Sequence, residues 1–147
     1  MARWVLDTNL YVRASHSREA RGALNAFHDR HFARTDLAAT VWLELQVGVR
    51  ERSIQVAFDE WVDTFVERDA VLTPSALAFQ QAGRVLGVLA DVEGLELDRI
   101  RPSFHHDVML ASTVRECGRT LITDNSRDFT RIQRYLQGFR FVAPFPK

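Results

Sequence analysis

Three short apolar runs constrain the fold of this chain more than any other feature. They are Trp4-Val5-Leu6, Ala70-Val71-Leu72 and Thr120-Leu121-Ile122-Thr123. None shows the alternation of polar and apolar residues that marks a strand with one wet face. Continuous runs are typical of strands buried on both faces of a parallel sheet. A last strand is predicted over 139–143.

Amphipathic helices are predicted between these strands, because apolar residues recur at three- and four-residue spacing. The predicted helices cover 17–32, 37–49, 58–66, 74–90, 104–116 and 129–136. Thr35 and Asp36 are expected to cap the second helix, and Asp128 the last. Strands that alternate with helices imply right-handed crossovers. We therefore expect an α/β protein, a three-layer α/β/α sandwich with a central, mainly parallel sheet.

Length and charge restrict the organisation and the partners. A chain of 147 residues, 46% hydrophobic and 26% charged, fits one domain over residues 1–147. Nineteen basic and nineteen acidic residues cancel, so any attraction for nucleic acid must come from a local patch. Lys147 is the only lysine. Arginine suits bidentate phosphate contacts, although we favour genomic base composition as the reason for this bias.

The cysteine content and the N-terminus indicate a compartment. The single cysteine, Cys117, cannot form an internal disulfide, and no Cys/His cluster has zinc spacing. The chain reaches Asp7 before the core of a signal peptide could form, and no apolar run approaches ~20 residues. We expect a cytoplasmic protein that is neither exported nor associated with a membrane.

Polar residues follow two of the predicted strands. Asp7-Thr8-Asn9 ends the first strand, and Asp124-Asn125 ends the strand that begins at Thr120. Ligands of open α/β sheets gather at the carboxyl ends of the strands. Local turn chemistry explains either group by itself. A functional interpretation therefore depends on their coincidence with other acidic residues.

Two such residues lie beside apolar helix faces. Glu44 is flanked by Val41 and Leu45, and Asp107 precedes Leu110 along the predicted buried stripe, although capping is an alternative for Asp107. Clustered buried carboxylates repel one another unless a cation lies between them. Oxygen ligands favour Mg²⁺ or Mn²⁺, which activate water against phosphodiesters. The predicted metal ligands are Asp7, Glu44, Asp107, Asp124 and Asn125.

Four segments together carry a family resemblance. They are 5–9 (Val-Leu-Asp-Thr-Asn), 42–48 (Trp-Leu-Glu-Leu-Gln-Val-Gly), 105–111 (His-His-Asp-Val-Met-Leu-Ala) and 121–129 (Leu-Ile-Thr-Asp-Asn-Ser-Arg-Asp-Phe). The chain resembles a PIN-domain protein of the VapC type over essentially its whole length. The set is specific, whereas each segment alone is weak. The resemblance implies a metal-dependent endoribonuclease, typically the homodimeric toxin of a toxin-antitoxin module, held inactive by a cognate antitoxin.

The resemblance also implies site residues. Asp7, Glu44 and Asp107 match the acidic positions of the family directly. The fourth position falls on Asn125, where many members carry Asp, and Asp124 and Asp128 stand one and three residues away. His106 occupies a position where Asn is common in relatives. The predicted catalytic residues are Asp7, Glu44, Asp107 and Asn125, and the residue that completes the site stays open among positions 124, 125 and 128.

Several polar residues flank the predicted site and are candidate RNA contacts, although solvated arginines and capping hydroxyls are the commoner case. They are Thr8, Asn9, Arg99, Arg101, Ser126 and Arg127. His105 and His106 also adjoin Asp107, but neighbouring helical residues point about 100° apart, so at most one faces the site. We favour a surface role for both.

Rival classes fit the residues less well. A phosphotransfer hydrolase of the haloacid dehalogenase type needs a second Asp where Asn9 stands, and a receiver-like module needs a lysine late in the sheet, which Lys147 cannot supply. Two alternatives remain. One is an RNA-processing PIN-type nuclease without an antitoxin, and the other is a catalytically inactive PIN-like module that binds RNA or a partner.

Overall fold

A five-stranded parallel sheet forms the centre of the molecule in the computed structural model, which describes residues 1–147. The strands stand in the order β3-β2-β1-β4-β5. Their bounds are β1 Trp4–Leu6, β2 Thr35–Ala38, β3 Val71–Leu72, β4 Thr120–Ile122 and β5 Phe141–Val142. The chain runs outward from β1 to β3 and then returns to β4 on the other side of β1. The order therefore reverses between β1 and β4, the place where open α/β sheets bind ligands.

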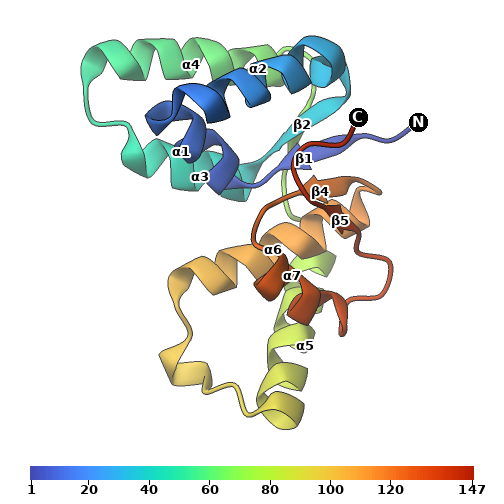
Figure 1. The fold of residues 1–147 in the computed structure, drawn as a ribbon. Coiled ribbons are helices and arrows are strands. Elements are labelled where there is room, and N and C mark those ends of the chain that lie inside the picture. Colours follow the sequence, from blue (N-terminus) through green and yellow to red (C-terminus); the bar gives the residue numbers. More distant parts are fainter.

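Seven helices surround the sheet. They are α1 Thr8–His16, α2 Arg18–His31, α3 Ala39–Gly48, α4 Arg52–Val66, α5 Ala76–Glu93, α6 Pro102–Glu116 and α7 Ser126–Gln133, with short 3₁₀ turns at Phe32–Arg34 and Leu97–Arg99. Figure 1 shows α1 to α4 grouped at one end of the molecule and α5 to α7 at the other, with the strands between them. None of the helices combines the length and the apolar character that crossing a membrane requires.

Side chains of the central strands pack on both faces of the sheet. Val5 and Leu121 belong to the larger core cluster, whereas Leu6 and Ile122 join a smaller cluster with residues of α1 and α2. This division follows from the alternation of side chains along a strand. The larger cluster includes residues of α5, α6 and α7. The predicted three-layer α/β/α architecture with a parallel sheet is therefore confirmed.

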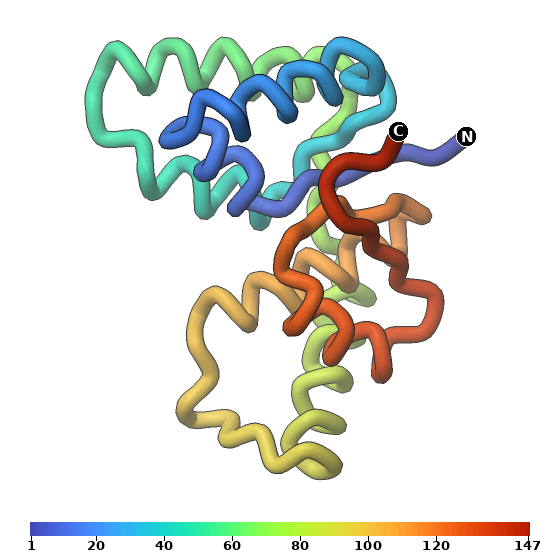
Figure 2. Tube along the Cα trace, viewed as in Figure 1, coloured from blue at the N-terminus to red at the C-terminus, as the bar shows by residue number.

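The chain ends meet on α2. Phe27 of α2 makes an edge contact with Trp4 of β1, with ring centroids 6.3 Å apart, and stacks on Phe145 near the C-terminus at 5.2 Å. Figure 2 shows both ends of the trace on the same side of the molecule. The first strand and the last residues therefore cover the same helix.

The prediction for residues 35 and 36 was wrong. Thr35 and Asp36 do not cap the helix that follows them but lie in β2, and α3 begins at Ala39. Asp36 is 1% exposed, and its carboxylate accepts from Arg3 at 2.7 Å and from Arg119 at 2.5 Å. These arginines neutralise the carboxylate within the sheet. The contact depends on residues distant in sequence, so a local pattern could not indicate it.

Two further helices differ from the prediction. Helix α1 was not predicted, and Asp7 is its N-cap, accepting from the Thr8 amide at 2.8 Å. Helix α7 begins at Ser126 rather than near 129, with Asn125 as its N-cap, so Asp128 lies in its first turn and does not cap it. The other predicted helices exist with shifted ends; α4 begins six residues earlier than predicted, at Arg52 rather than 58.

Candidate metal centre

A small polar pocket lies at the carboxyl ends of β1 and β4. It encloses about 250 Å³, and no hydrophobic residue lines it. Its lining comprises Asp7, Thr8, Asn9, Glu44, Arg101, Ser103, Asp107, Asn125 and Asp128. Asp7 follows β1 and Asn125 follows β4, while Glu44 projects from α3 and Asp107 from α6. The fold thus brings four of the five predicted metal ligands to the point where the strand order reverses.

Asp7 is the most buried carboxylate of this pocket. It is 4% exposed, and it accepts hydrogen bonds from the Thr8 amide at 2.8 Å and from the Thr123 hydroxyl at 2.7 Å. Burial raises the pKa of Asp7, and the nearby Glu44 and Asp124 raise it further, whereas the two hydrogen bonds lower it. Because the raising effects prevail, ionised Asp7 is unfavourable in the metal-free pocket, and a bound cation would stabilise it.

Thr123 joins the ends of the two central strands. Its buried hydroxyl donates to Asp7 Oδ2 and accepts from the backbone N–H of Asn125 at 3.0 Å. One side chain therefore sets the position of a carboxylate on β1 and of the backbone after β4. The local sequence does not indicate this role, and its only signal is the place of Thr123 at the end of an apolar run.

Glu44 is held by a threonine beside it. The Thr8 hydroxyl donates to Glu44 Oε1 at 3.0 Å. His106 Nδ1 lies 3.9 Å from Glu44 Oε2, and His105 is exposed. The expectation that only one of the two histidines faces the site agrees with this placement, but the preferred surface role describes His105 alone.

Asp107 has the most perturbed carboxyl group of the pocket. Burial, together with the charges of Asp7, Asp128 and Glu44, raises its pKa to about 8, while Arg101 opposes the rise. An aspartate at an ordinary site titrates near 4. Without a cation, Asp107 therefore keeps its proton at neutral pH.

Several polar residues lie near the place expected for the fourth metal ligand. Asn125 lines the pocket, and its Nδ2 donates to Asp128 Oδ2 at 3.1 Å. Asp128 also lines the pocket. Asp124 does not, because its carboxylate pairs with Arg13 of α1. The lining of the carboxylate pocket therefore excludes Asp124 and includes Asp128, the third candidate for the fourth position.

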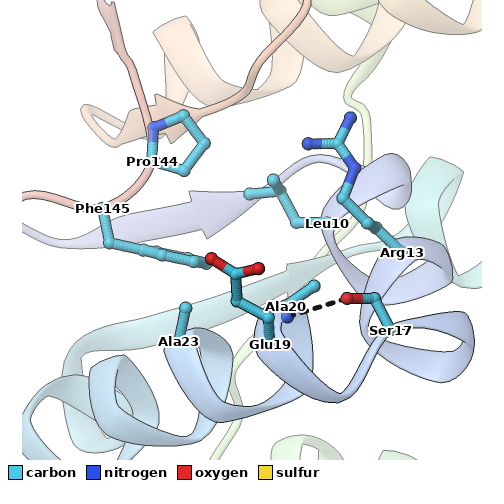
Figure 3. A pocket seen from close by; sticks show the side chains of 8 residues that line it. All are labelled: Leu10, Arg13, Ser17, Glu19, Ala20, Ala23, Pro144 and Phe145. Carbon is cyan, nitrogen blue, oxygen red and sulfur yellow. Dashed lines mark hydrogen bonds between the residues drawn. The ribbon is translucent and has the colours of Figure 1, made fainter.

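Arg13 forms an ion pair with Asp124, which does not line the carboxylate pocket. Figure 3 shows Arg13 at the edge of a separate pocket between α1, α2 and the C-terminal segment, with its guanidinium pointing away from Glu19 and Phe145. None of the predicted metal ligands lines that second pocket. This groove lies between packed segments. Its link to the carboxylate pocket is the ion pair between Arg13 and Asp124.

The candidate RNA contacts divide by position. Thr8, Asn9 and Arg101 line the carboxylate pocket, and Arg127 lines an adjoining pocket. Arg99 is 78% exposed and pairs with Glu96 at 3.1 Å, so it lies outside both. Ser126 is exposed at the first position of α7. Ser103, which the sequence did not single out, also lines the carboxylate pocket.

The donors of the pocket suit a hard cation. Apart from Arg101, the lining side chains offer oxygen atoms of carboxylates, two amides and hydroxyls, the ligands that Mg²⁺ and Mn²⁺ prefer. No three His, Cys, Asp or Glu side chains are close enough together to hold one ion directly. Mg²⁺ commonly uses one or two carboxylates and keeps several waters. The pKa values of Asp7 and Asp107 are both raised, which indicates that this pocket lacks a compensating positive charge. Its residues therefore fit an ion that is held partly through water.

Solved structures resemble the chain over most of its length. It matches VapBC2 from Rickettsia felis bound to a promoter DNA fragment with a TM-score of 0.62, 23% identity, and coverage of 95% of this chain and 97% of the other. It matches DNA-bound VapBC from Salmonella typhimurium with a TM-score of 0.64 and 23% identity, and the match covers 97% of this chain and 98% of the other. It matches VapBC-1 from nontypeable Haemophilus influenzae with a TM-score of 0.66 and 18% identity, and the match covers 95% of this chain and 96% of the other.

Sequence comparison adds nothing to this likeness. No protein-family model matches the chain, and no curated protein matches it. Similarity at 18–23% identity shows a shared fold. The chain therefore has the fold of a chain found in VapBC toxin-antitoxin complexes, which confirms at the level of fold the resemblance to VapC-type PIN domains.

Proposed function

We propose that the chain is a metal-dependent endoribonuclease, the toxin of a toxin-antitoxin module, which hydrolyses RNA phosphodiesters at the carboxylate pocket. The observation that carries the proposal is the convergence of Asp7, Glu44 and Asp107 on one polar pocket at the reversal of strand order. The pKa of Asp107, which burial and the neighbouring carboxylates raise to about 8, supports it, because strongly perturbed pKa values cluster at functional sites. The fold shared with VapBC complexes points to the same class.

The proposed roles follow from position. Asp7, Glu44, Asp107 and Asn125 would hold Mg²⁺ or Mn²⁺, which when bound supplies Lewis-acid stabilisation of phosphoryl oxygens. Thr123 orients Asp7 and Thr8 orients Glu44 through their hydroxyl groups. Arg101 is 70% exposed at the lining of the pocket and is available to a substrate phosphate.

An apolar groove beside the pocket supports a protein partner. It encloses about 530 Å³ between α1, α3 and α4, and seven of its eleven lining residues are hydrophobic, among them Ile54, Phe58 and Trp61. Glu44 lines both this groove and the carboxylate pocket. An antitoxin segment in the groove would therefore end at the proposed metal ligands and block them. We further propose one domain over residues 1–147, a homodimer, and action in the cytoplasm without a membrane.

The experiment compares RNA cleavage by the wild type, Asp7→Asn and Asp91→Asn, each with Mg²⁺, with Mn²⁺ and with a chelator. Asp91 is an exposed carboxylate of α5 and serves as the matched control. We expect Asp7→Asn to lose cleavage with its fold intact, because the amide keeps the shape but loses the charge that a hard cation requires. Undiminished cleavage by Asp7→Asn, or full cleavage in the chelator, would refute the proposal.

The same purified protein discriminates the alternatives. Cleavage that the product of a small neighbouring gene suppresses on copurification indicates a toxin. Cleavage with no such partner indicates an RNA-processing nuclease. Absence of cleavage with either metal indicates an inactive module that binds RNA or a partner.

A further inference from the structure

We propose that a second, arginine-lined pocket binds a phosphate of the RNA strand next to the phosphodiester that is cleaved. This inference rests on the proposed function, since it assigns a substrate subsite to the same reaction. The pocket encloses about 700 Å³, and no hydrophobic residue lines it. Its lining comprises Arg101, Asn125, Arg127, Asp128 and Arg131.

The arginine pocket is continuous with the carboxylate pocket. Arg101, Asn125 and Asp128 line both. A strand that places one phosphodiester among the carboxylates therefore passes directly into the arginine pocket. The groove that shares Glu44 with the carboxylate pocket is, by contrast, mainly apolar.

The lining charge favours an anion. Three guanidinium groups face the pocket against one carboxylate, that of Asp128. Arg101 is held by Asp128 at 3.3 Å and remains 70% exposed. Arg127 is exposed and takes part in none of the ion pairs or side-chain hydrogen bonds of the protein. Its guanidinium is therefore free to bind a ligand.

Arg131 is held in place from behind. Its Nε donates to Glu93 Oε1 at 3.0 Å, and its guanidinium lies 5.8 Å from the centre of the Phe104 ring. An arginine positioned in this way loses less side-chain entropy when it binds a phosphate. The pocket thus combines two guanidinium groups that are paired with carboxylates, those of Arg101 and Arg131, with the unpaired guanidinium of Arg127.

Electrostatics gives the pocket a purpose within the proposed reaction. The chain has equal numbers of basic and acidic residues, so it exerts no overall attraction on RNA. The carboxylate pocket repels a phosphate until a cation is present. Arginine forks suit phosphate oxygens. The adjoining arginines therefore supply the attraction that both the whole chain and the carboxylate pocket lack.

The first test measures binding of a single-stranded RNA oligonucleotide to the full chain carrying Asp7→Asn, as a function of salt. Arg127→Gln and Arg131→Gln are each added to this background, with Arg52→Gln as the control, because Arg52 is exposed on α4 and lines none of these pockets. We expect Arg127→Gln and Arg131→Gln to weaken binding several-fold. Each should lower the salt slope of the logarithm of the affinity by about 0.7, the value for one phosphate contact on a single strand.

The second test locates the phosphate. An RNA that the wild type cleaves is made with one uncharged methylphosphonate linkage next to the cleaved bond, on either side in turn. On one side the neutral linkage should weaken binding to the Asp7→Asn protein, while Arg127→Gln should weaken it no further. Since Arg127 holds no structural contact, a folding defect cannot produce this non-additivity.

The outcomes separate the two proposals. If wild type binds and cleaves RNA but Arg127→Gln equals Arg52→Gln, the subsite is overturned and the nuclease stands. If Arg127→Gln and both neutral linkages are additive, the arginine does not contact a neighbouring phosphate. If Arg127→Gln loses only the binding of a protein partner, the pocket is a protein-docking surface instead. If the wild type neither binds nor cleaves RNA, the proposed function fails and the subsite fails with it.

Discussion

Replacing Asp107 by asparagine should stabilise the metal-free protein in a pH-dependent way. Asparagine keeps the shape of the side chain and has no charge to desolvate. The pKa of Asp107 is raised from 3.8 to about 8, so the folded protein binds more protons than the unfolded chain between these values. Stability from this group is therefore complete below about pH 4 and is lost as the pH rises towards about 8.

The magnitude follows from the pKa change. A rise of this size corresponds to at most about 6 kcal/mol in the free energy of unfolding. Asp107 is half-buried, so solvent screens part of the repulsion from Asp7, Asp128 and Glu44. We therefore expect Asp107→Asn to gain about 2 kcal/mol over the wild type at about pH 8, and to match it at about pH 4.

Urea unfolding of both proteins in a chelator, at a series of pH values, measures this difference. Asp91→Asn is the control, because its exposed carboxylate should give no pH-dependent gain. Addition of Mg²⁺ should reverse the order of stability, since only the wild type keeps the Asp107 ligand. A gain that is equal at about pH 4 and about pH 8, or no gain at either, would contradict the explanation by burial and charge repulsion at Asp107.

Three further measurements test other parts of the site and fold. Thr123→Val should retain the fold but lower the Mg²⁺ affinity measured by calorimetry about 10–100-fold, because Asp7 loses the hydrogen bond to its Oδ2. The control is Thr113→Val, which should leave the affinity unchanged, because the Thr113 hydroxyl donates only within its own helix. Mg²⁺ uptake at about pH 7 should release a proton from Asp107, seen as buffer-dependent heat, and no release would contradict its assignment as a ligand. Asp36→Asn should cost about 3 kcal/mol in urea unfolding, because it breaks the pairs with two arginines.

Local sequence patterns determined much of this fold. The runs at 4–6 and 120–122 became two adjacent strands of the sheet, because burial on both faces favours apolar residues at successive positions. Asp7, Glu44 and Asp107 were also found from the sequence, since each interrupts an apolar surface that the surrounding residues define. A carboxylate at such a position needs a hydrogen-bond donor or a cation beside it. The structure brings all three carboxylates to one pocket.

Tertiary structure decided the features that depend on distant pairs. The bond from Thr123 to Asp7 spans 116 residues. Strand β2 forms around Asp36 only because Arg3 and Arg119 neutralise it from other parts of the chain.

The pairing of Asp124 with Arg13, which leaves Asn125 in the pocket, likewise depends on the packing of α1 beside β4. An isolated segment offers the same hydrogen-bonding choices to Asp124, Asn125 and Asp128. Only the folded chain supplies the partner that selects among them, since the energy of a buried charge depends on the groups that surround it in space.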